Sequence, residues 1–137
     1  MLKDKKAVIF DLDGTLVDSM WIWWEIDERF LGQYGLQVPE GLNDLLEGFS
    51  FNETAEYFKD NFPLPLSIQE IKDTWNRMAF EMYMNEIPLK EGAKEFLDIL
   101  KEKNLPLGIA TSNSRELTKA CLDAHGIGEY FQYICCL

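Results

Sequence analysis

The chain has 137 residues, 47% of them hydrophobic, which is enough for one globular domain, with room for an insertion but not for two full domains. Its 24 acidic and 13 basic residues give a formal net charge of −11, which disfavours general attraction to nucleic acids or anionic membranes. Three cysteines and one histidine exclude a disulfide framework and a His-rich metal site. No stretch approaches the roughly 18 apolar residues of a membrane span. We therefore expect a cytoplasmic protein with neither a nucleic acid nor a membrane partner.

The first predicted strand covers residues 6–10, a short apolar run that is typical of a strand buried on both faces. Asp11 and Asp13 follow it directly, at a turn that contains Gly14. In open α/β sheets, ligands bind at the carboxyl ends of the strands, where an aspartate can attack phosphorus or bind a cation. The sequence therefore predicts a catalytic site here, and the simpler alternative is a polar exit from the strand.

Residues 18–86 are predicted to form an all-helical insert. Apolar residues at helical spacing predict a first helix over about 19–34, ending at Gly35. Capping boxes that begin at Ser50 and Ser67 predict two further helices. The insert is therefore expected to be a helical cap domain.

The remaining residues, 1–17 and 87–137, are predicted to form a partial Rossmann-like core domain. A second strand is expected over 105–110, and residues 130–134 favour a third. A helical crossover between consecutive strands makes them parallel neighbours. The predicted fold class is therefore α/β, with an incomplete parallel sheet of about three strands and an inserted helical cap.

Polar residues also follow the second predicted strand, in the order Thr111, Ser112 and Asn113. Because the carboxyl ends of parallel strands meet at one edge of a sheet, we expect Asp11 to face Thr111. The Thr111 hydroxyl and the amides of Ser112 and Asn113 at a helix start would suit a bound anion. The alternative is that these residues only cap the helix, with Asn113 and Glu116 forming a capping box.

Together these residues predict phosphoryl transfer. Asp11 would attack the phosphorus of a monoester, and water would later hydrolyse the aspartyl-phosphate. Asp13 would protonate the leaving oxygen and then take a proton from water. A carboxylate and a phosphate dianion repel each other, so a hard divalent cation such as Mg²⁺ would be needed to neutralise both. The backbone at Leu12 and Gly14 is expected to offer amides to the phosphate.

Two motifs resemble those of the haloacid dehalogenase superfamily of phosphohydrolases. Residues 11–19, Asp-Leu-Asp-Gly-Thr-Leu-Val-Asp-Ser, resemble its first motif, and residues 109–113, Ile-Ala-Thr-Ser-Asn, resemble its second. The insert resembles the small helical cap of the branch that contains β-phosphoglucomutase and phosphoglycolate phosphatase. The resemblance implies that Asp11 is the nucleophile and a Mg²⁺ ligand, that Asp13 is the acid/base and a second Mg²⁺ ligand through its backbone carbonyl, and that Thr111 binds the phosphoryl group.

The family also carries a lysine and an acidic pair after its second motif, and neither is found here before Leu137. We therefore expect a truncated product of a longer gene, with impaired activity. Its open sheet edge would favour self-association or completion by another chain. A catalytically inactive remnant or subunit that acts by association is the corresponding alternative function.

The insert offers two substrate candidates, Trp23 and Arg77. Trp23 stands where the resembling mutases carry a histidine, and residues 46–51 lack their basic residue. A phosphatase for a small, sugar-phosphate-like metabolite is therefore expected rather than a β-phosphoglucomutase-like mutase, which remains an alternative. Packing within the cap is the simpler role for Trp23, and a solvated helix face is the simpler role for Arg77.

Overall fold

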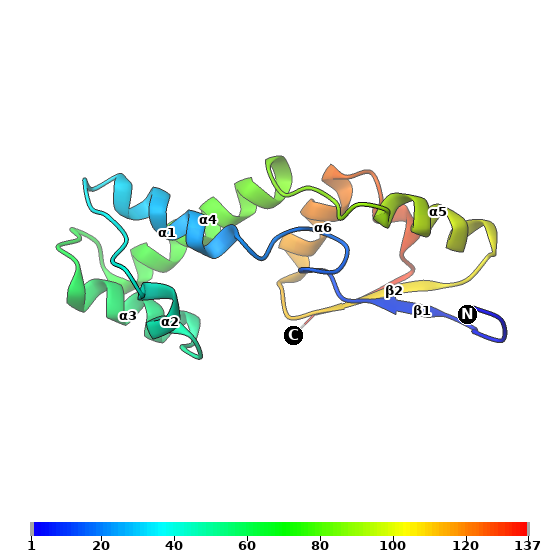
Figure 1. The fold of residues 1–137 in the computed structure, drawn as a ribbon, viewed down its shortest axis with the longest axis horizontal. Coiled ribbons are helices and arrows are strands. Elements are labelled where there is room, and N and C mark those ends of the chain that lie inside the picture. The colour runs from blue at the N-terminus through cyan, green and yellow to red at the C-terminus, as the bar shows by residue number, and fades with distance from the viewer. Residues whose placement is uncertain (1, 137) are drawn as a thin grey trace. The chain divides into compact units, whose positions relative to one another are not determined.

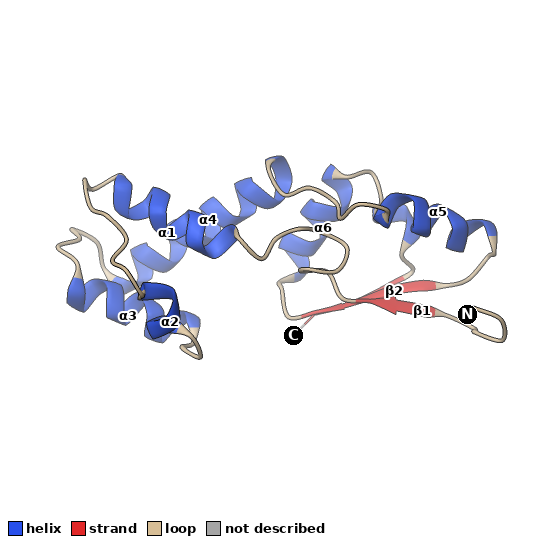
Figure 2. Ribbon diagram, in the orientation of Figure 1, coloured by secondary structure: helices blue, strands red, loops and turns tan. Residues whose placement is uncertain are grey.

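The computed structural model describes residues 2–136 (Figures 1 and 2). The chain divides into two compact units. Residues up to Met20 and those from Phe80 onward form one, which we call the sheet unit, and Trp21–Ala79 form the other, the helical unit. Among the residues described, no helix combines the length and hydropathy that crossing a bilayer requires.

The sheet unit contains three parallel strands in the order β1-β2-β3, namely β1 (Val8–Phe10), β2 (Leu107–Thr111) and β3 (Tyr133–Cys136). Val8 pairs with Leu107 at one end of the sheet, and Thr111 pairs with Cys136 at the other. The predicted α/β class with a three-stranded parallel sheet is therefore confirmed.

The third strand begins later than the sequence predicted. A short 3-10 helix, η1 (Gly128–Tyr130), occupies the first of the expected strand positions, 130–134. The Tyr130 hydroxyl donates to the carboxylate of Asp98, and the Lys94 ammonium donates to that hydroxyl over 2.6 Å. These bonds hold Tyr130 toward a neighbouring helix, so the extended segment starts only at Tyr133.

Helices α5 (Ala93–Glu102) and α6 (Arg115–Ala124) cover one face of the sheet (Figure 1). On this face Phe10 makes edge contacts with Phe96 and Phe131, at ring-centroid distances of 6.0 and 6.3 Å. The other face is open, because Ile9 and Tyr133 are 73% and 72% exposed. An apolar hollow of about 370 Å³ lies over the same strands.

The two segments that leave and re-enter the sheet unit are paired with each other. Val17, which is fully buried, forms an antiparallel bridge with Leu89. The amide of Asp18 donates to the carbonyl of Pro88 over 2.9 Å. Both ends of the intervening chain are therefore anchored side by side on the core.

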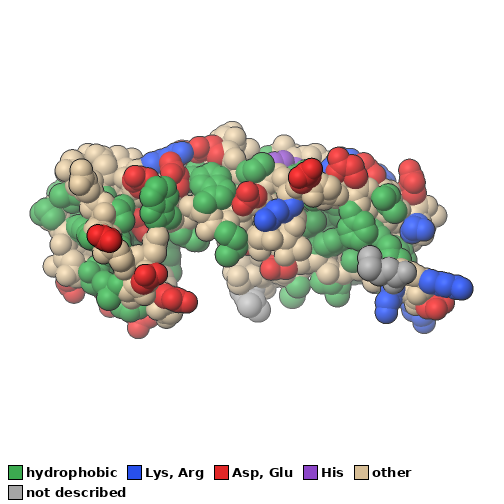
Figure 3. All heavy atoms as spheres, in the orientation of Figure 1, with side chains coloured by type: hydrophobic (Ala, Val, Ile, Leu, Met, Phe, Trp, Pro, Cys, Tyr) green, Lys and Arg blue, Asp and Glu red, His purple; other side chains and the backbone are tan. Residues whose placement is uncertain are grey.

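The helical unit contains α1 (Ile22–Gly32), α2 (Leu42–Leu46), α3 (Phe51–Asn61) and most of α4 (Ile68–Asn85). The rings of Phe30, Phe58 and Trp75 meet at its centre, with centroids 4.9 to 6.2 Å apart. The short α2 was not predicted, because five residues are too few to show a helical period. Figure 3 shows acidic side chains scattered over the visible face, with basic side chains among them and several basic ones close together at one edge.

Both predicted capping boxes are confirmed. The Ser50 hydroxyl accepts from the Glu53 amide over 3.2 Å, and the Glu53 carboxylate accepts from the Ser50 amide over 2.7 Å. Ser67 and Glu70 make the same two bonds, at 3.1 and 2.8 Å. Helix α1 begins at Ile22, later than predicted.

Candidate active site

Asp11 lies immediately after β1, at the carboxyl end of the sheet, and its side chain is exposed. One carboxylate oxygen, Oδ1, accepts from the amide of Leu12 over 2.8 Å. This contact to the adjacent residue restrains the side chain at the strand end while leaving it open to solvent. An accessible, oriented carboxylate of this kind is what nucleophilic attack on a ligand requires.

The turn after Asp11 depends on Gly14. Its φ of +74° lies in the left-handed region, where residues with a Cβ are strained. A Cβ here would also stand 3.0 Å from the sulfur of Met20. The amide of Gly14 donates to the carbonyl of Val17 over 2.9 Å, so this amide closes the turn. The assignment of the Leu12 and Gly14 amides to phosphate binding stays a prediction.

The carboxylate of Asp13 receives hydrogen bonds from three side chains. The hydroxyls of Ser19 and Tyr83 both donate to Oδ1, the former over 2.7 Å. The side-chain amide of Asn113 donates to Oδ2 over 2.6 Å and to the Tyr83 hydroxyl over 3.2 Å. Because these donors come from three separate segments, they fix the orientation of the Asp13 side chain.

The ends of β1 and β2 meet as predicted, and Asn113 makes the connection. Asp13 and Asn113 are 100 positions apart in sequence. Thr111 is 6% exposed, and its hydroxyl oxygen accepts from the backbone amide of Asn113 over 3.1 Å. That hydroxyl still carries a proton that can be donated to a ligand. Ser112, beside it, is exposed.

The prediction that Asn113 and Glu116 cap the next helix is wrong. The N-cap of α6 is Ser114, whose hydroxyl accepts from the Leu117 amide over 3.2 Å. Asn and Ser are equally good caps, and the sequence places them side by side. Since Ser114 caps the helix, the side chain of Asn113 is available to hold Asp13.

The Asp13 charge and local burial influence two neighbouring groups. Burial, reinforced by the Asp13 carboxylate, raises the pKa of Tyr83, so its hydroxyl stays protonated and remains a donor to Asp13. Burial also raises the pKa of the Cys121 thiol to about 12, with a further contribution from Asp13. Cys121 is therefore an inert thiol beneath the site.

Sequence reasoning missed the roles of Ser19 and Tyr83. Ser19 belongs to the first motif, and the apolar spacing predicts a helix that begins there, whereas in the structure its side chain is 3% exposed and donates to Asp13. Tyr83 lies near the end of α4, where it belongs to the sheet unit. The sequence offered one indication of this role: a tyrosine, which is aromatic but carries a hydroxyl, stands a few residues before the chain returns to the core domain at residue 87.

The two substrate candidates, Trp23 and Arg77, lie in the helical unit. Trp23 is 46% exposed on α1, and its ring meets that of Phe51 edge-on at 5.9 Å. Arg77 is exposed on α4, and its side chain makes no hydrogen bond or ion pair with the residues that the structure describes. A role for either in substrate binding stays a prediction.

The donors at the strand ends suit a hard cation that is shared with a ligand. Within residues 2–136, no group of three or more His, Cys, Asp or Glu side chains is placed to hold a metal ion. The Asp13 carboxylate already accepts hydrogen bonds from three donors, so the exposed carboxylate of Asp11 is the one that is open to a metal ion. Mg²⁺ commonly binds one or two carboxylates together with water and phosphate oxygens. The residues present fit such an ion rather than a closed protein cage.

The sequence matches the model of a known family, the haloacid dehalogenase-like hydrolases, over residues 8–137. The chain belongs to this family. Among its relatives, a phosphoglycolate phosphatase from Photobacterium profundum is 29% identical over 136 residues, covering 92% of this chain and 58% of the relative. A phosphorylated carbohydrates phosphatase from Thermotoga maritima is 25% identical over 126 residues, with the same two shares.

The family fold is also seen in solved structures. A crystal structure from Thermotoga maritima, described as that of a beta-phosphoglucomutase, superposes with a TM-score of 0.85 at 24% identity. The match covers 96% of this chain and 61% of that one. The likeness confirms the haloacid dehalogenase-like fold. The chain spans somewhat more than half the length of the relatives it matches.

Proposed function

We propose that this haloacid dehalogenase-like chain carries the nucleophile and phosphate-binding residues of a phosphomonoesterase that acts on a small phosphorylated metabolite. One observation carries the proposal: Asp13 is held by Asn113 across the two strand ends, over 2.6 Å, next to the exposed Asp11. An open carboxylate beside a rigidly oriented one provides separate candidates for the nucleophile and the proton carrier.

Asp11 is the proposed nucleophile. A carboxylate oxygen forms a bond to phosphorus while the bond to the leaving oxygen breaks, giving an aspartyl-phosphate. Water then attacks the same phosphorus, which releases inorganic phosphate and restores the Asp11 carboxylate. The exposure of Asp11 leaves room for both an ester and a water molecule.

Asp13 is the proposed proton carrier. It protonates the leaving oxygen in the first step and receives the proton of the attacking water in the second. Ser19, Tyr83 and Asn113 act as positioning residues, because their bonds aim the Asp13 carboxylate. A side chain held in this way loses little conformational entropy when the transition state forms.

The phosphoryl oxygens are proposed to bind the Thr111 hydroxyl and the backbone amides near Ser112, in the bend that leads into α6. Mg²⁺ held by Asp11 and Asp13 would neutralise the charge of the phosphate and of the attacking carboxylate. With two aspartates at the strand end, this charge compensation is needed before a dianion can approach.

The proposed substrate is a sugar-phosphate-like metabolite, in keeping with the phosphatases for phosphoglycolate and phosphorylated carbohydrates among the relatives. Hydrolysis is favoured over mutase chemistry because Trp23 occupies the place of the histidine in the resembling mutases. At this position the chain therefore has an indole ring, which cannot act as a second proton carrier as a histidine could.

Hydrolysis of p-nitrophenyl phosphate with and without Mg²⁺ tests the proposal. We expect Mg²⁺-dependent turnover that is lost in Asp11→Asn. Borohydride should reduce the aspartyl-phosphate at Asp11 to homoserine with release of phosphate, and mass spectrometry should locate the homoserine at position 11. Asp60→Asn, an exposed carboxylate on α3, is the control and should match the parent. Equal turnover in Asp11→Asn and the parent would contradict the assignment.

A second candidate function, association without catalysis, is favoured by the open face of the sheet. Ile9 and Tyr133 are largely exposed there, beside an apolar hollow of about 370 Å³. We propose a second copy of the chain as the occupant, since it would present the same apolar face and the two faces could cover each other. Sedimentation should then show a dimer that Ile9→Lys dissociates, and a monomeric parent would overturn this candidate.

A further inference from the structure

The helical unit contains a cavity of about 610 Å³ with aromatic walls. Its lining includes four aromatic side chains, Trp23, Phe49, Phe51 and Trp75. The ring of Phe51 contacts those of Trp23 and Trp75, at centroid distances of 5.9 and 5.6 Å. Three of the four are partly exposed, so the cavity has an opening to solvent. A volume of this size accommodates a small organic molecule.

A buried carboxylate, that of Asp27 on α1, also lines the cavity. Asp27 is 8% exposed, and its side chain makes no hydrogen bond or ion pair with any residue the structure describes. Burial raises its pKa to about 7, which reflects how poorly an unpaired charge is solvated here. An unpartnered, buried carboxylate in a cavity wall is a group that a ligand can satisfy.

The charges around the cavity exclude an anion. Asp44 and Glu47 line it together with Asp27, and no Lys or Arg does so among the residues described. The phosphoryl group proposed for the sheet unit would be repelled by these three carboxylates. The complementary ligand is therefore positively charged and partly apolar.

We propose that this cavity binds a small organic ammonium group. Aromatic faces attract a cation through their quadrupoles, most strongly when both are shielded from water, and a carboxylate adds a direct ionic contact. A hydrated metal ion fits less well, because it needs several oxygen ligands and the walls are mainly ring carbon. Quaternary or primary amines with apolar bodies match both kinds of wall.

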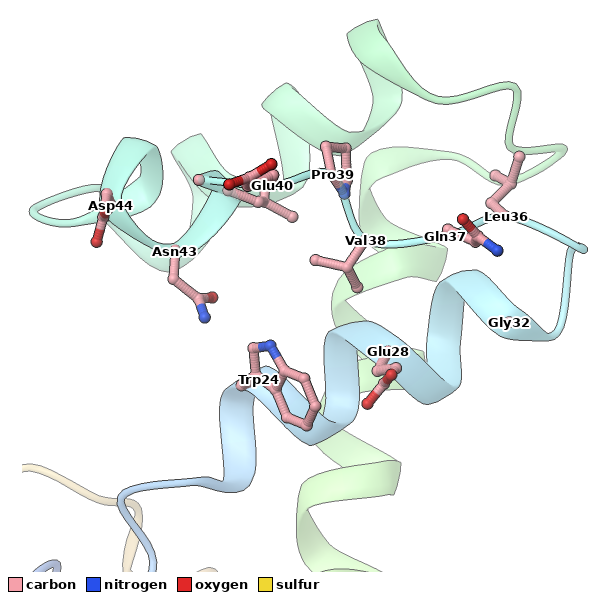
Figure 4. Close-up of a pocket in the computed structure, with 12 residues that line it drawn as sticks. Trp24, Glu28, Gly32, Leu36, Gln37, Val38, Pro39, Glu40, Asn43 and Asp44 are labelled. Carbon is pink, nitrogen blue, oxygen red and sulfur yellow. The ribbon is translucent and has the colours of Figure 1, made fainter.

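Another cavity in the same unit, of about 660 Å³, lacks these features. Figure 4 shows Trp24 and Glu28 of α1 facing Val38 and Asn43 across it. Trp24 is the aromatic side chain in its lining, and none of the described residues around it is a buried, unpartnered carboxylate. It therefore provides a matched control, since Trp23 and Trp24 are neighbours with 46% and 45% exposure.

Calorimetric titration of the full chain tests the proposal with two cations and their neutral analogues. Choline is compared with 3,3-dimethylbutan-1-ol, and benzylamine with benzyl alcohol. We expect at least one cation to bind about tenfold or more tightly than its analogue. Asp27→Asn and Trp23→Leu should each weaken that binding by about tenfold, and Trp24→Leu should leave it unchanged. If neither cation outbinds its analogue, or if Asp27→Asn binds as the parent does, the proposal is wrong.

The affinity should also depend on pH through Asp27. The cation binds the ionised carboxylate, so its affinity should rise between about pH 6 and about pH 8. Asp44 on α2 and Glu47 after it face the same cavity, while the described residues of α3 and α4 contribute no titratable side chain to its lining. The Asp27→Asn variant must therefore flatten the profile, and an unchanged profile in that variant would contradict the role of Asp27.

Binding is measured without turnover, so a failure of the phosphatase proposal leaves this result intact and can be recognised separately.

Discussion

The side-chain amide of Asn113 donates to the carboxylate of Asp13 over 2.6 Å, and this bond joins the ends of β1 and β2. Asp13 lies in an isolated bridge with Val17 and Asn113 lies in a bend, so the pairing of β1 with β2 does not by itself bring the two side chains together. The bond therefore couples the geometry of the candidate site to the register of the sheet. Four variants test the surroundings of Asp13 and the buried Asp27.

Asn113→Asp should destabilise the fold at neutral pH. It replaces a donor to Asp13 with a second carboxylate at the same distance, and the repulsion should lower the free energy of unfolding by about 1–3 kcal/mol. Urea denaturation at neutral pH measures it. Asn76→Asp, on the exposed face of α4, is the control, and equal losses in the two variants would contradict the role of Asn113.

Tyr83→Phe removes one of the three donors to Asp13 with little change in shape. We expect a loss of about 1–2 kcal/mol in the free energy of unfolding, because the partly buried Asp13 carboxylate loses one of its three hydrogen bonds. If the chain hydrolyses p-nitrophenyl phosphate, kcat should fall more than KM rises, since the substitution disturbs the orientation of a group that acts in the transition state. Tyr57→Phe, in the helical unit, should alter neither quantity.

Gly14→Ala should destabilise the sheet unit through two separate effects. The first is the positive φ of +74°, and the second is a Cβ 3.0 Å from the Met20 sulfur. Gly35→Ala shares a φ of +71° but meets nothing within 4 Å, so it measures the backbone effect alone, at about 1 kcal/mol. The excess loss at Gly14 should disappear in the double variant with Met20→Ala. Thermal denaturation of the four proteins gives the comparison, and identical losses at the two glycines would exclude the Met20 contact.

Asp27→Asn should stabilise the protein at high pH and not at low pH. Burial raises the pKa of Asp27 from its ordinary 3.8 to about 7, so the folded state holds this proton more tightly than the unfolded chain. The contribution of Asp27 to stability therefore falls as the pH rises from about 4 to about 7, and it stays low above that. The variant should gain roughly 2–4 kcal/mol over the parent at about pH 8 and little at about pH 4. Asp60→Asn should show no such pH dependence, and an equal gain at both pH values would rule out this explanation.

The strand ends were predictable because their signals are local. An apolar run followed by Asp11, Asp13 and Gly14 marks a strand that ends in a turn, and parallel pairing then brings Thr111 to the same edge. The capping boxes at Ser50 and Ser67 are equally local, since each needs only four consecutive residues.

The contacts around Asp13 were not predictable in the same way. Asn113 and Ser114 compete for one helix cap, and only the tertiary structure shows that Ser114 takes it. Tyr83 reaches Asp13 from 70 positions away, so no local pattern announces the bond. The isolation of Asp27 was also hidden, because a helical period indicates which face is buried and does not reveal what shares the cavity.

The bridge between Val17 and Leu89 has a practical consequence for engineering. Because this bridge already holds the outgoing and returning segments together, the residues between Val17 and Leu89 form a loop whose two ends are fixed next to each other. Replacing the residues between Val17 and Leu89 with a short Asn-Gly turn should yield a minimal sheet protein. A foreign helical module inserted at the same two points should fold independently of the sheet.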